Sequence, residues 1–446
     1  MRRRRVLVVS YHFPPVGGAG VQRIAKFVRY LPEFGWDVSV LQAANPSVPL
    51  IDDSLLAGLP ADLVVERART FEPSYATKQT VGAPGSAARG GVGAAAKRSL
   101  RRAAAIALQP DAQVLWLPDA VRRGRRLLGR MSHDAILATA PSYTNLVVGA
   151  MLARHSGLPL LTDFRDEWDL SSTYWENAPK DGATLAVQRR LQRYVLRRSA
   201  AVVATTAAST ARLAARATEA GATPLARCIY NGWDADDLRH AAEVAPAVPR
   251  RDGVFRLLYT GTLWNLTSIA PLADALTQLA STSPGLLRRL ELVVMGRKTP
   301  EQQAQLTRMA ALGCAPVDVP YAEHPVAVAT MRSADALLLL LSDLPGVDRV
   351  APAKAFEYFA AARPMLAILP DGETAGLVRS VEPGAHFVPA DISGIAGWLA
   401  QRLSGNTVSR ELAGADRTAA IARFERRALT GELAGVLDQL VAGRAA

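Results

Sequence analysis

The chain alternates between short, continuous apolar runs and longer amphipathic stretches. An apolar run of strand length is typical of a parallel strand that helices cover on both faces. The first run spans residues 6–10, and a glycine-containing loop at 11–20 and a predicted helix at about 21–31 follow it. The same pattern predicts further strands in this half of the chain at 38–41, 135–139, 159–162, 201–205 and 228–230. Strands that alternate with helices predict a doubly wound parallel sheet.

A second set of alternating elements follows a segment rich in alanine, proline and charge at 241–253, which we interpret as an interdomain linker. Predicted strands then span 255–259, 290–295, 317–319, 336–341 and 364–369, and predicted helices span 353–362, 395–403 and 415–440. Ser393 is the expected N-cap of the helix at 395–403. The sequence thus predicts two Rossmann-like domains with parallel sheets, at 1–240 and 254–414, followed by C-terminal helices at 415–446.

The composition is that of a soluble globular protein, because 49% of the 446 residues are apolar and 21% are charged. No apolar run reaches the length that spans a bilayer, and the run after the basic start is too short for a signal peptide. Cys228 and Cys314 lie far apart and match no metal-binding spacing. We therefore expect two free thiols in a reducing compartment and a cytoplasmic protein.

The positive charge is confined to the first half of the chain. Residues 1–240 hold 32 Lys and Arg against 20 Asp and Glu, whereas residues 241–446 hold 20 of each. A general bias toward basic residues would have charged both halves. The first half is therefore expected to face an anionic partner.

A basic stretch at 97–130 departs from the alternating pattern. Its cations are interleaved with leucine, isoleucine and tryptophan, which predicts a basic amphipathic surface. Such a surface fits an anionic membrane or a lipid phosphate, but a solvated pair of helices has the same pattern, and the sequence leaves both open. The cations are Lys97, Arg98, Arg101, Arg102, Arg122, Arg123, Arg125, Arg126 and Arg130.

Gly17 and Gly18 follow the first predicted strand. A loop without side chains at this point lets a ligand approach the backbone, although a plain turn would use the same residues. The glycines do not form the G-x-G-x-x-G pattern, and no acid ends the second strand. A Rossmann dehydrogenase is therefore not expected.

Asp163, Arg165 and Asp166 follow the strand at 159–162, at the edge where α/β proteins hold their ligands. A helix cap is the alternative role for Asp166. Asp234 and Asp236 also invite comparison with a D-x-D metal site. No acid-rich strand lies near them, so we expect no metal there.

The stretch 348–373 has the features of a phosphate and ribose site. Arg349 and Lys354 lie in or next to a loop that feeds a predicted helix, and the free N–H groups of a helix N-terminus suit a phosphate. Glu357, one turn further in, could accept two ribose hydroxyls. An exposed i,i+3 ion pair between Lys354 and Glu357 is the alternative. The position of the stretch at the carboxyl edge of the second predicted sheet favours the ligand site.

These features together resemble a family 4 glycosyltransferase of the GT-B fold, in which two doubly wound domains face each other across a cleft. The resemblance covers essentially the whole chain. Five segments in the same order carry it: 11–23 (YHFPPVGGAGVQR), 163–168 (DFRDEW), 231–234 (NGWD), 259–263 (YTGTL) and 352–366 (PAKAFEYFAAARPML). The resemblance implies sugar transfer from a nucleotide diphosphate donor, with retention at the anomeric carbon and without a metal or another cofactor. It also implies a final segment that crosses back to the first domain.

The resemblance implies roles for residues of both domains. Glu357 matches the acid that binds the donor ribose, and Tyr321 lies near the segment that contacts the base. Asp163, Arg165 and Asp166 are expected near the reacting centre. The implied donor-binding set is Gly17, Gly18, Gly261, Thr262, Arg297, Tyr321, Arg349, Lys354, Phe356 and Glu357.

The sequence departs from the family pattern at three positions. Arg349 stands where many members carry a second Glu, Thr262 where many carry an Arg, and Arg165 where many carry a His. Without a metal, a leaving diphosphate needs cations or helix N-termini. We infer that these cations have moved to Arg349 and Lys354, with Arg297 as a further candidate.

The acceptor is expected on the basic first domain. A lipid-linked or polysaccharide precursor at the inner face of the membrane fits this charge, and a soluble natural-product acceptor is the nearest alternative. A GT-B epimerase would need several acids and histidines, whereas this chain has six His in total. A non-catalytic membrane or nucleic-acid binder would not explain the stretch 348–373, and we expect no nucleic-acid partner. The cations expected to face the acceptor or membrane are Arg98, Arg101, Arg102, Arg122 and Arg123.

Overall fold

The computed structural model describes residues 3–48, 50–73, 106–168, 170, 182–405 and 414–445. The chain forms two compact units, one of Met1–Ile229 with Leu429–Ala446 and one of Tyr230–Ala428. The first unit therefore ends before residue 240, and the segment 241–253 belongs to the second unit. Arg256 holds this segment there, because its guanidinium donates to the carbonyls of Val248 (2.8 Å) and Pro249 (2.6 Å).

The sheet of the first unit has seven parallel strands in the order β3-β2-β1-β4-β5-β6-β7. The strands are β1 (Arg4–Val9), β2 (Trp36–Ala43), β3 (Val64–Ala68), β4 (Ala135–Ala140), β5 (Leu160–Phe164), β6 (Ser199–Ala204) and β7 (Leu225–Cys228). The apolar pattern predicted β1, β2, β4, β5 and β6. The strand predicted at 228–230 overlaps β7 only at Cys228, and β3 was not predicted because Glu66 and Arg67 interrupt the apolar run of this edge strand. The order reverses between β1 and β4, the point at which doubly wound sheets bind ligands.

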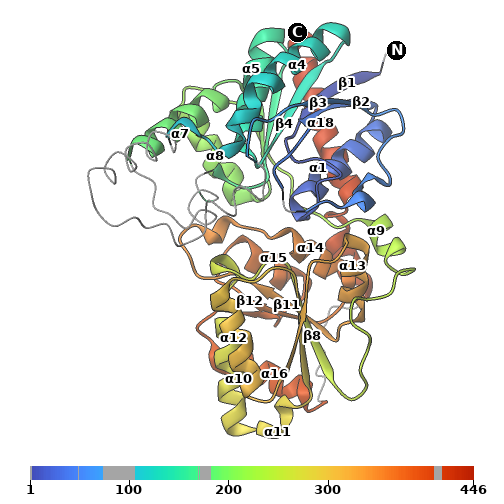
Figure 1. The fold of residues 1–446 in the computed structure, drawn as a ribbon, viewed down its shortest axis with the longest axis vertical. Helices are drawn as coiled ribbons and strands as arrows, with labels where there is room; N and C mark the ends of the chain where they lie inside the picture. The colour runs from blue at the N-terminus through green and yellow to red at the C-terminus, as the bar shows by residue number, and fades with distance from the viewer. Residues whose placement is uncertain are drawn as a thin grey trace. The chain divides into compact units, whose positions relative to one another are not determined.

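Helices cover both faces of this sheet (Figure 1). The face that buries Val6 and Val8 packs against α1 (Ala19–Tyr30) and α18 (Arg426–Ala445). The opposite face buries Leu7 and Val9 against α4 (Leu117–Arg130), α5 (Tyr143–Ser156), α7 (Gly182–Leu196) and α8 (Ala207–Glu219). Asp438 of α18 accepts a hydrogen bond from the Trp36 indole at 3.0 Å and pairs with Arg4, so the end of the chain completes this unit.

The sheet of the second unit has six parallel strands in the order β10-β9-β8-β11-β12-β13. The strands are β8 (Phe255–Thr260), β9 (Leu290–Met295), β10 (Ala315–Val319), β11 (Ala336–Leu340), β12 (Met365–Ile368) and β13 (His386–Phe387). The apolar pattern predicted all of them except the two-residue β13. The order reverses between β8 and β11, as it does between β1 and β4 in the first unit.

The helices of the second unit also form two layers (Figure 1). One core cluster joins the sheet to α10 (Ala270–Thr282), α11 (Pro284–Leu287), α12 (Pro300–Ala311) and α16 (Ile392–Leu403). The other joins it to α13 (His324–Ser333), α14 (Ala353–Ala361), α15 (Glu373–Val381) and α17 (Gly414–Ala422). The short helix α9 (Ala235–His240) packs against α13.

Two details of the helices differ from the expectations. The N-cap of α16 is Asp391, whose carboxylate accepts from the Gly394 N–H at 2.9 Å, and not Ser393, which lies within the helix. The predicted tail is two helices, α17 and α18, because Phe424 between them is buried against Tyr230 and Phe356. The Asp391 cap is a local contact, whereas the partners of Phe424 lie far from it in the sequence.

Within the described ranges, no helix combines the length and the apolar character needed to cross a bilayer.

Candidate functional site

Two glycines lie at the carboxyl edge of the second sheet, one after β8 and one after β9. Gly261 and Gly296 have φ angles of +117° and +121°, a region that side-chain-bearing residues rarely adopt. A Cβ on Gly296 would lie 2.4 Å from the Gly261 carbonyl oxygen, and a Cβ on Gly261 would lie 2.8 Å from Lys354 Nζ. The two glycines therefore let two loops and a lysine side chain converge on one spot.

Lys354, in the first turn of α14, reaches across this glycine pair. Its Nζ lies 2.7 Å from Tyr259 Oη and 3.9 Å from the centre of the Tyr259 ring. Burial lowers the pKa of Lys354 to about 7, against an opposing attraction from Glu357. Burial also raises the pKa of Tyr259, so the phenol stays protonated and donates to the Thr262 carbonyl at 2.9 Å. The hydrogen-bond partner of the ammonium is thus a neutral phenol, which leaves the charge available to an anion.

Glu357, one turn further along α14, is held by a histidine. His324 Nε2 lies 3.0 Å from Glu357 Oε1, and His324 Nδ1 lies 3.7 Å from Asp237 Oδ2. All three side chains are less than a quarter exposed. Lys354 donates to Tyr259 and Glu357 meets His324, so the simple i,i+3 ion pair is not the observed arrangement. Asp237 and His324 were not among the expected site residues, because no local pattern links positions so far apart.

Arg349 lies in the short 3-10 helix η5 (Val347–Arg349), just before α14. Its guanidinium is 3.9 Å from Asp348 and its side chain is 24% exposed. The loop rests on Gly372, where a Cβ would lie 2.6 Å from Asp348 Cα. The N-terminus of α15 thus supports the loop that carries Arg349.

The other expected donor-binding residues of the second unit are spread over different surroundings. Phe356 is fully buried and packs edge-on against Phe424, so its ring belongs to the core. Arg297 and Tyr321 are exposed. The buried cation after β9 is instead Lys298, whose Nζ donates to the Gly296 carbonyl at 2.7 Å and pairs with Asp318.

In the first unit, the two glycines after β1 have different surroundings. A Cβ on Gly17 would lie 2.8 Å from Leu50 Cγ, and the Gly17 N–H donates to the Leu50 carbonyl, so this glycine serves loop packing. Gly18 is the N-cap of α1 with φ +102°, and no atom lies within 4 Å of a Cβ built there. Gly18 is therefore the glycine that leaves open space at the helix N-terminus.

Asp163 is the last residue but one of β5, and its side chain is 0% exposed. Arg23 of α1 donates to both carboxylate oxygens, with Nη2 2.9 Å from Oδ1 and Nε 3.2 Å from Oδ2. Thr139 Oγ1 donates to Oδ2 at 2.8 Å. This buried pair ties α1 to the sheet. Arg23 was not among the expected site residues, although it closes the first segment of the family resemblance, which is the signal that could have pointed to it.

Arg165 and Asp166 lie beyond β5 and pair with each other. The Arg165 side chain is 13% exposed, and its Nη1 would lie 2.7 Å from a Cβ on Gly20, so it sits at the first turn of α1. Its buried Nε has no hydrogen-bond partner among the described residues. The structure thus brings Arg165 next to Gly20, at the start of α1.

Of the five cations expected to face an acceptor, three lie outside the described residues and two have ion pairs within the first unit. Arg98, Arg101 and Arg102 lie outside the described residues. Arg122 pairs with Asp119, and Arg123 pairs with Asp119 and with Glu66 of β3, at 3.0 and 2.9 Å. Arg123 therefore holds α4 against the edge of the sheet, whereas the Arg122 pair lies within α4 itself.

Asp234 is the N-cap of α9, where its carboxylate accepts from the N–H groups of Asp236 and Asp237. Among the residues with a described position, no three His, Cys, Asp or Glu side chains are grouped to hold a metal.

Solved structures of similar fold match nearly the whole chain. The structure of trehalose 6-phosphate synthase from Burkholderia multivorans has a TM-score of 0.65 at 14% identity, over 100% of both chains. HepE from Anabaena, in complex with UDP-glucose, has a TM-score of 0.60 at 16% identity, over 98% of this chain and 99% of that chain. A Burkholderia xenovorans trehalose-phosphate synthase with glucose-6-phosphate has a TM-score of 0.62 at 13% identity, over 99% and 100%.

At this level of identity the similarity establishes the fold, which is the predicted GT-B class with two parallel-sheet α/β domains. No protein-family model matches the sequence, and a search of curated proteins finds no match either.

Proposed function

We propose that this chain is a glycosyltransferase that moves a sugar from a nucleotide diphosphate to an acceptor, with retention and without a metal. The observation that carries this proposal is the placement of Lys354 and Glu357, each with a partner of its own, at the switch point of the second sheet. An amine whose partner is a neutral phenol and an acid held by a histidine lie one turn apart on the same helix, next to two glycines. The similar fold of HepE, whose structure holds UDP-glucose, supports this reading.

In this proposal the donor lies along the N-terminal turn of α14. The carboxylate of Glu357 accepts the two ribose hydroxyls, and His324 keeps that carboxylate oriented. Lys354, Arg349 and the free N–H groups of the helix meet the diphosphate. Gly261 and Gly296 contribute by leaving room for phosphate oxygens close to the backbone. Thr262, Arg297 and Tyr321 flank this position and are proposed to contact the donor more peripherally.

The proposed reaction exchanges one bond at the anomeric carbon. The bond from that carbon to the diphosphate oxygen breaks, and the acceptor hydroxyl oxygen bonds to the carbon from the same face. The hydroxyl proton passes to the departing phosphate. The leaving diphosphate gains negative charge, which the cations and helix N–H groups stabilise in place of a metal.

The first unit is proposed to hold the acceptor and the sugar. Gly18 leaves the N-terminus of α1 accessible, and Arg165 adds a positive charge beside it. Asp166 is the carboxylate proposed to contact hydroxyls, because its side chain is 34% exposed. Asp163 acts as a positioning residue through Arg23. The excess positive charge of this half favours an acceptor linked to a lipid phosphate or to a polysaccharide precursor, at the inner face of the membrane.

Binding of a nucleotide tests the proposal most directly. The thermal midpoint of the protein is measured with a panel of nucleoside diphosphates and nucleotide sugars, and we expect stabilisation by at least one of them. No shift with any member of the panel would favour a non-catalytic binding protein. Incubation with the stabilising nucleotide sugar alone then separates a transferase from an epimerase, since an epimerase converts the donor without an acceptor.

The cations proposed for the diphosphate are tested by Lys354→Ala and Arg349→Ala. We expect turnover to fall in both variants. Unchanged turnover in both would remove the proposed relocation of the diphosphate cations to these positions.

A further inference from the structure

From residue 189 onward, every exposed position of helix α7 and of the two residues after it is an arginine. Its buried residues are Thr184, Gln188, Gln192, Val195 and Leu196, which pack toward the sheet. Its outer face and the two residues that follow it expose five arginines within ten positions. We call Arg189, Arg190, Arg193, Arg197 and Arg198 the α7 arginine face.

Among the described residues, these arginines have no counter-charge. None of the five has a hydrogen bond or ion pair to an acidic side chain there, and Arg198 instead lies over the Tyr194 ring, 5.9 Å from its centre. Three arginines of α4 behave differently, because Arg122, Arg123 and Arg130 each pair with Asp119 or Glu66. Arg125 and Arg126 of the same helix have no ion pair among the described residues, but they are two neighbouring positions and not a row along the helix.

Helix stability does not account for the α7 arginine face. Arg189, Arg193 and Arg197 succeed one another at i,i+4, a spacing at which like charges destabilise a helix. The helix dipole favours cations only near the last turn, so it accounts for Arg193 and not for Arg189 and Arg190 in the middle of α7. The face costs stability in the isolated protein, which points to an external anion.

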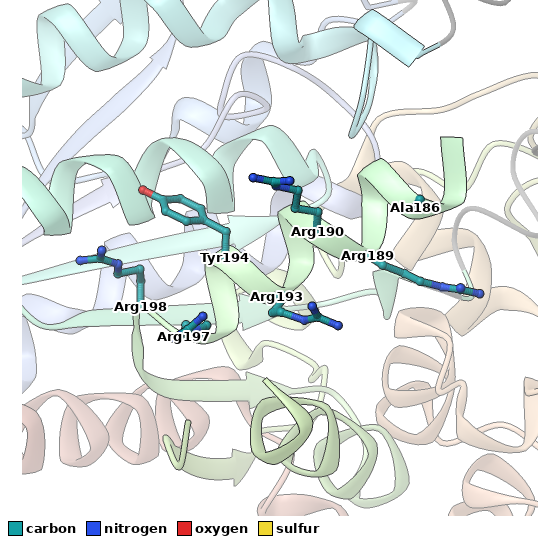
Figure 2. A pocket seen from close by; sticks show the side chains of 7 residues that line it. All are labelled: Ala186, Arg189, Arg190, Arg193, Tyr194, Arg197 and Arg198. Atoms are coloured by element: carbon teal, nitrogen blue, oxygen red, sulfur yellow. The ribbon is translucent and has the colours of Figure 1, made fainter. Parts of the chain in front are cut away.

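The arginines also line a hollow. Figure 2 shows Arg190, Tyr194 and Arg198 extending to one side of the helix and Arg189 and Arg193 extending to the other. The hollow has a volume of about 830 Å³, and Ala186 is its remaining lining residue. It offers guanidinium groups and one phenol, which suits phosphate groups.

The length of the α7 arginine face favours a partner with many phosphates over a ligand with a single phosphate or diphosphate. Nine positions separate Arg189 from Arg198, about 14 Å along a helix, which is longer than a single diphosphate. Tyr194 is the one aromatic side chain on this face, whereas single-stranded nucleic acid needs several rings for stacking. A layer of lipid headgroups presents phosphates over the whole length.

We propose that the α7 arginine face docks the protein on an anionic phospholipid surface, through contacts between the arginines and headgroup phosphates. This inference rests on the proposed function, because a membrane surface is where a lipid-linked acceptor would be met. It moves the expected membrane contact from α4, where Arg122 and Arg123 are neutralised, to α7.

Vesicle co-sedimentation of the full chain tests the proposal. The vesicles contain phosphatidylcholine alone or phosphatidylcholine with phosphatidylglycerol, at low ionic strength. The test variant is Arg189→Gln/Arg193→Gln/Arg197→Gln. The matched control removes the same charge from exposed arginines elsewhere in the unit that have no ion pair among the described residues: Arg125→Gln/Arg126→Gln/Arg212→Gln.

We expect the wild type and the control to bind the anionic vesicles and not the neutral ones. The test variant should partition about 100-fold more weakly, roughly fivefold for each arginine removed. Equal loss in both triple variants, or none in the test variant, would overturn the proposal. So would wild-type binding to a soluble anionic polysaccharide or to RNA with no binding to anionic vesicles.

The thermal midpoint with the stabilising nucleotide separates this proposal from the proposed function. A test variant whose thermal midpoint still rises with the nucleotide, but which no longer binds anionic vesicles, supports both proposals. A wild type that binds anionic vesicles through α7 without any nucleotide shift contradicts the transferase and leaves the docking surface standing. Because the substitutions relieve repulsion between arginines, the test variant should unfold no earlier than the wild type.

Discussion

His324 Nε2 lies 3.0 Å from Glu357 Oε1, and the opposite nitrogen of the same ring lies 3.7 Å from Asp237. The imidazole thus stands between two carboxylates on α9 and α14. A side chain that must accept two ribose hydroxyls benefits from a fixed orientation, because the cost of ordering it has been met before the ligand arrives. This relationship makes His324 a positioning residue for the proposed donor site.

His324→Ala should weaken binding of a nucleoside diphosphate about tenfold, the value of roughly one hydrogen bond to a charged group. Inorganic pyrophosphate has no ribose, so its affinity should not change. Isothermal titration of the two ligands measures the difference. His324→Gln, which keeps a donor near Glu357, is the matched control and should recover part of the affinity. Equal losses for both ligands would contradict the positioning role.

Lys354 should make donor binding depend on pH. Its pKa is about 7 in the ligand-free protein because burial disfavours the ammonium, and a neighbouring diphosphate would raise that pKa in the complex. The complex then holds the proton more tightly than the free protein does. Affinity for a nucleotide sugar should therefore fall as the pH rises above about 7, by up to about tenfold per pH unit.

Titration of affinity against pH with UDP-glucose checks this prediction, since its diphosphate has no proton to lose near neutral pH. Lys354→Met is the control. It should bind about 10- to 100-fold more weakly below pH 7 and should lose the pH dependence. A wild-type affinity that stays constant across this range would show that the Lys354 amine does not meet the diphosphate.

Asp163→Asn should act on stability first. The substitution leaves the buried Arg23 guanidinium without its counter-charge, which costs about 3 kcal/mol or more of unfolding free energy. Asp166→Asn removes a partly exposed carboxylate and should cost less than about 1 kcal/mol. Thermal unfolding ranks the two variants, and turnover at a temperature where both are folded then reports on the chemistry. A lost activity in Asp163→Asn with an unchanged midpoint would instead favour direct contact with substrate.

Gly296→Ala and Gly18→Ala should differ in their effect on stability. Both positions have positive φ, which costs a side chain roughly 1–3 kcal/mol. Gly296→Ala also drives a Cβ to within 2.4 Å of the Gly261 carbonyl oxygen, whereas the space around Gly18 is open. Calorimetry should therefore show the lower thermal midpoint for Gly296→Ala. Its free energy of unfolding should be lower than that of Gly18→Ala by the cost of an overpacked contact, about 1–3 kcal/mol. The reverse order would contradict the convergence of the two loops after β8 and β9.

The sequence by itself determined the layered fold. Runs such as 6–9 and 336–340 are apolar at every position, which only a strand covered on both faces requires, and their alternation with helices leaves little choice but two doubly wound sheets. The sequence also placed Gly261 and Lys354 at one edge, because the carboxyl ends of parallel strands meet there. The uneven charge of the two halves can also be counted directly from the sequence. Short or polar edge strands such as β3 could not be predicted from the apolar pattern, since their burial comes from neighbouring elements.

The tertiary structure alone decided which charges are neutralised. Asp163 meets Arg23 across 140 positions of the chain, and Arg123 meets Glu66 across 57, so two expected ligand contacts are occupied by internal partners. His324 reaches Glu357 across 33 positions, while the arginines of α7 meet no acid among the described residues. Local patterns give the direction of a side chain from its own helix or strand, but the partner at its tip comes from another element. For that reason the positions of the candidate ligand contacts followed from the sequence, and their availability followed only from the fold.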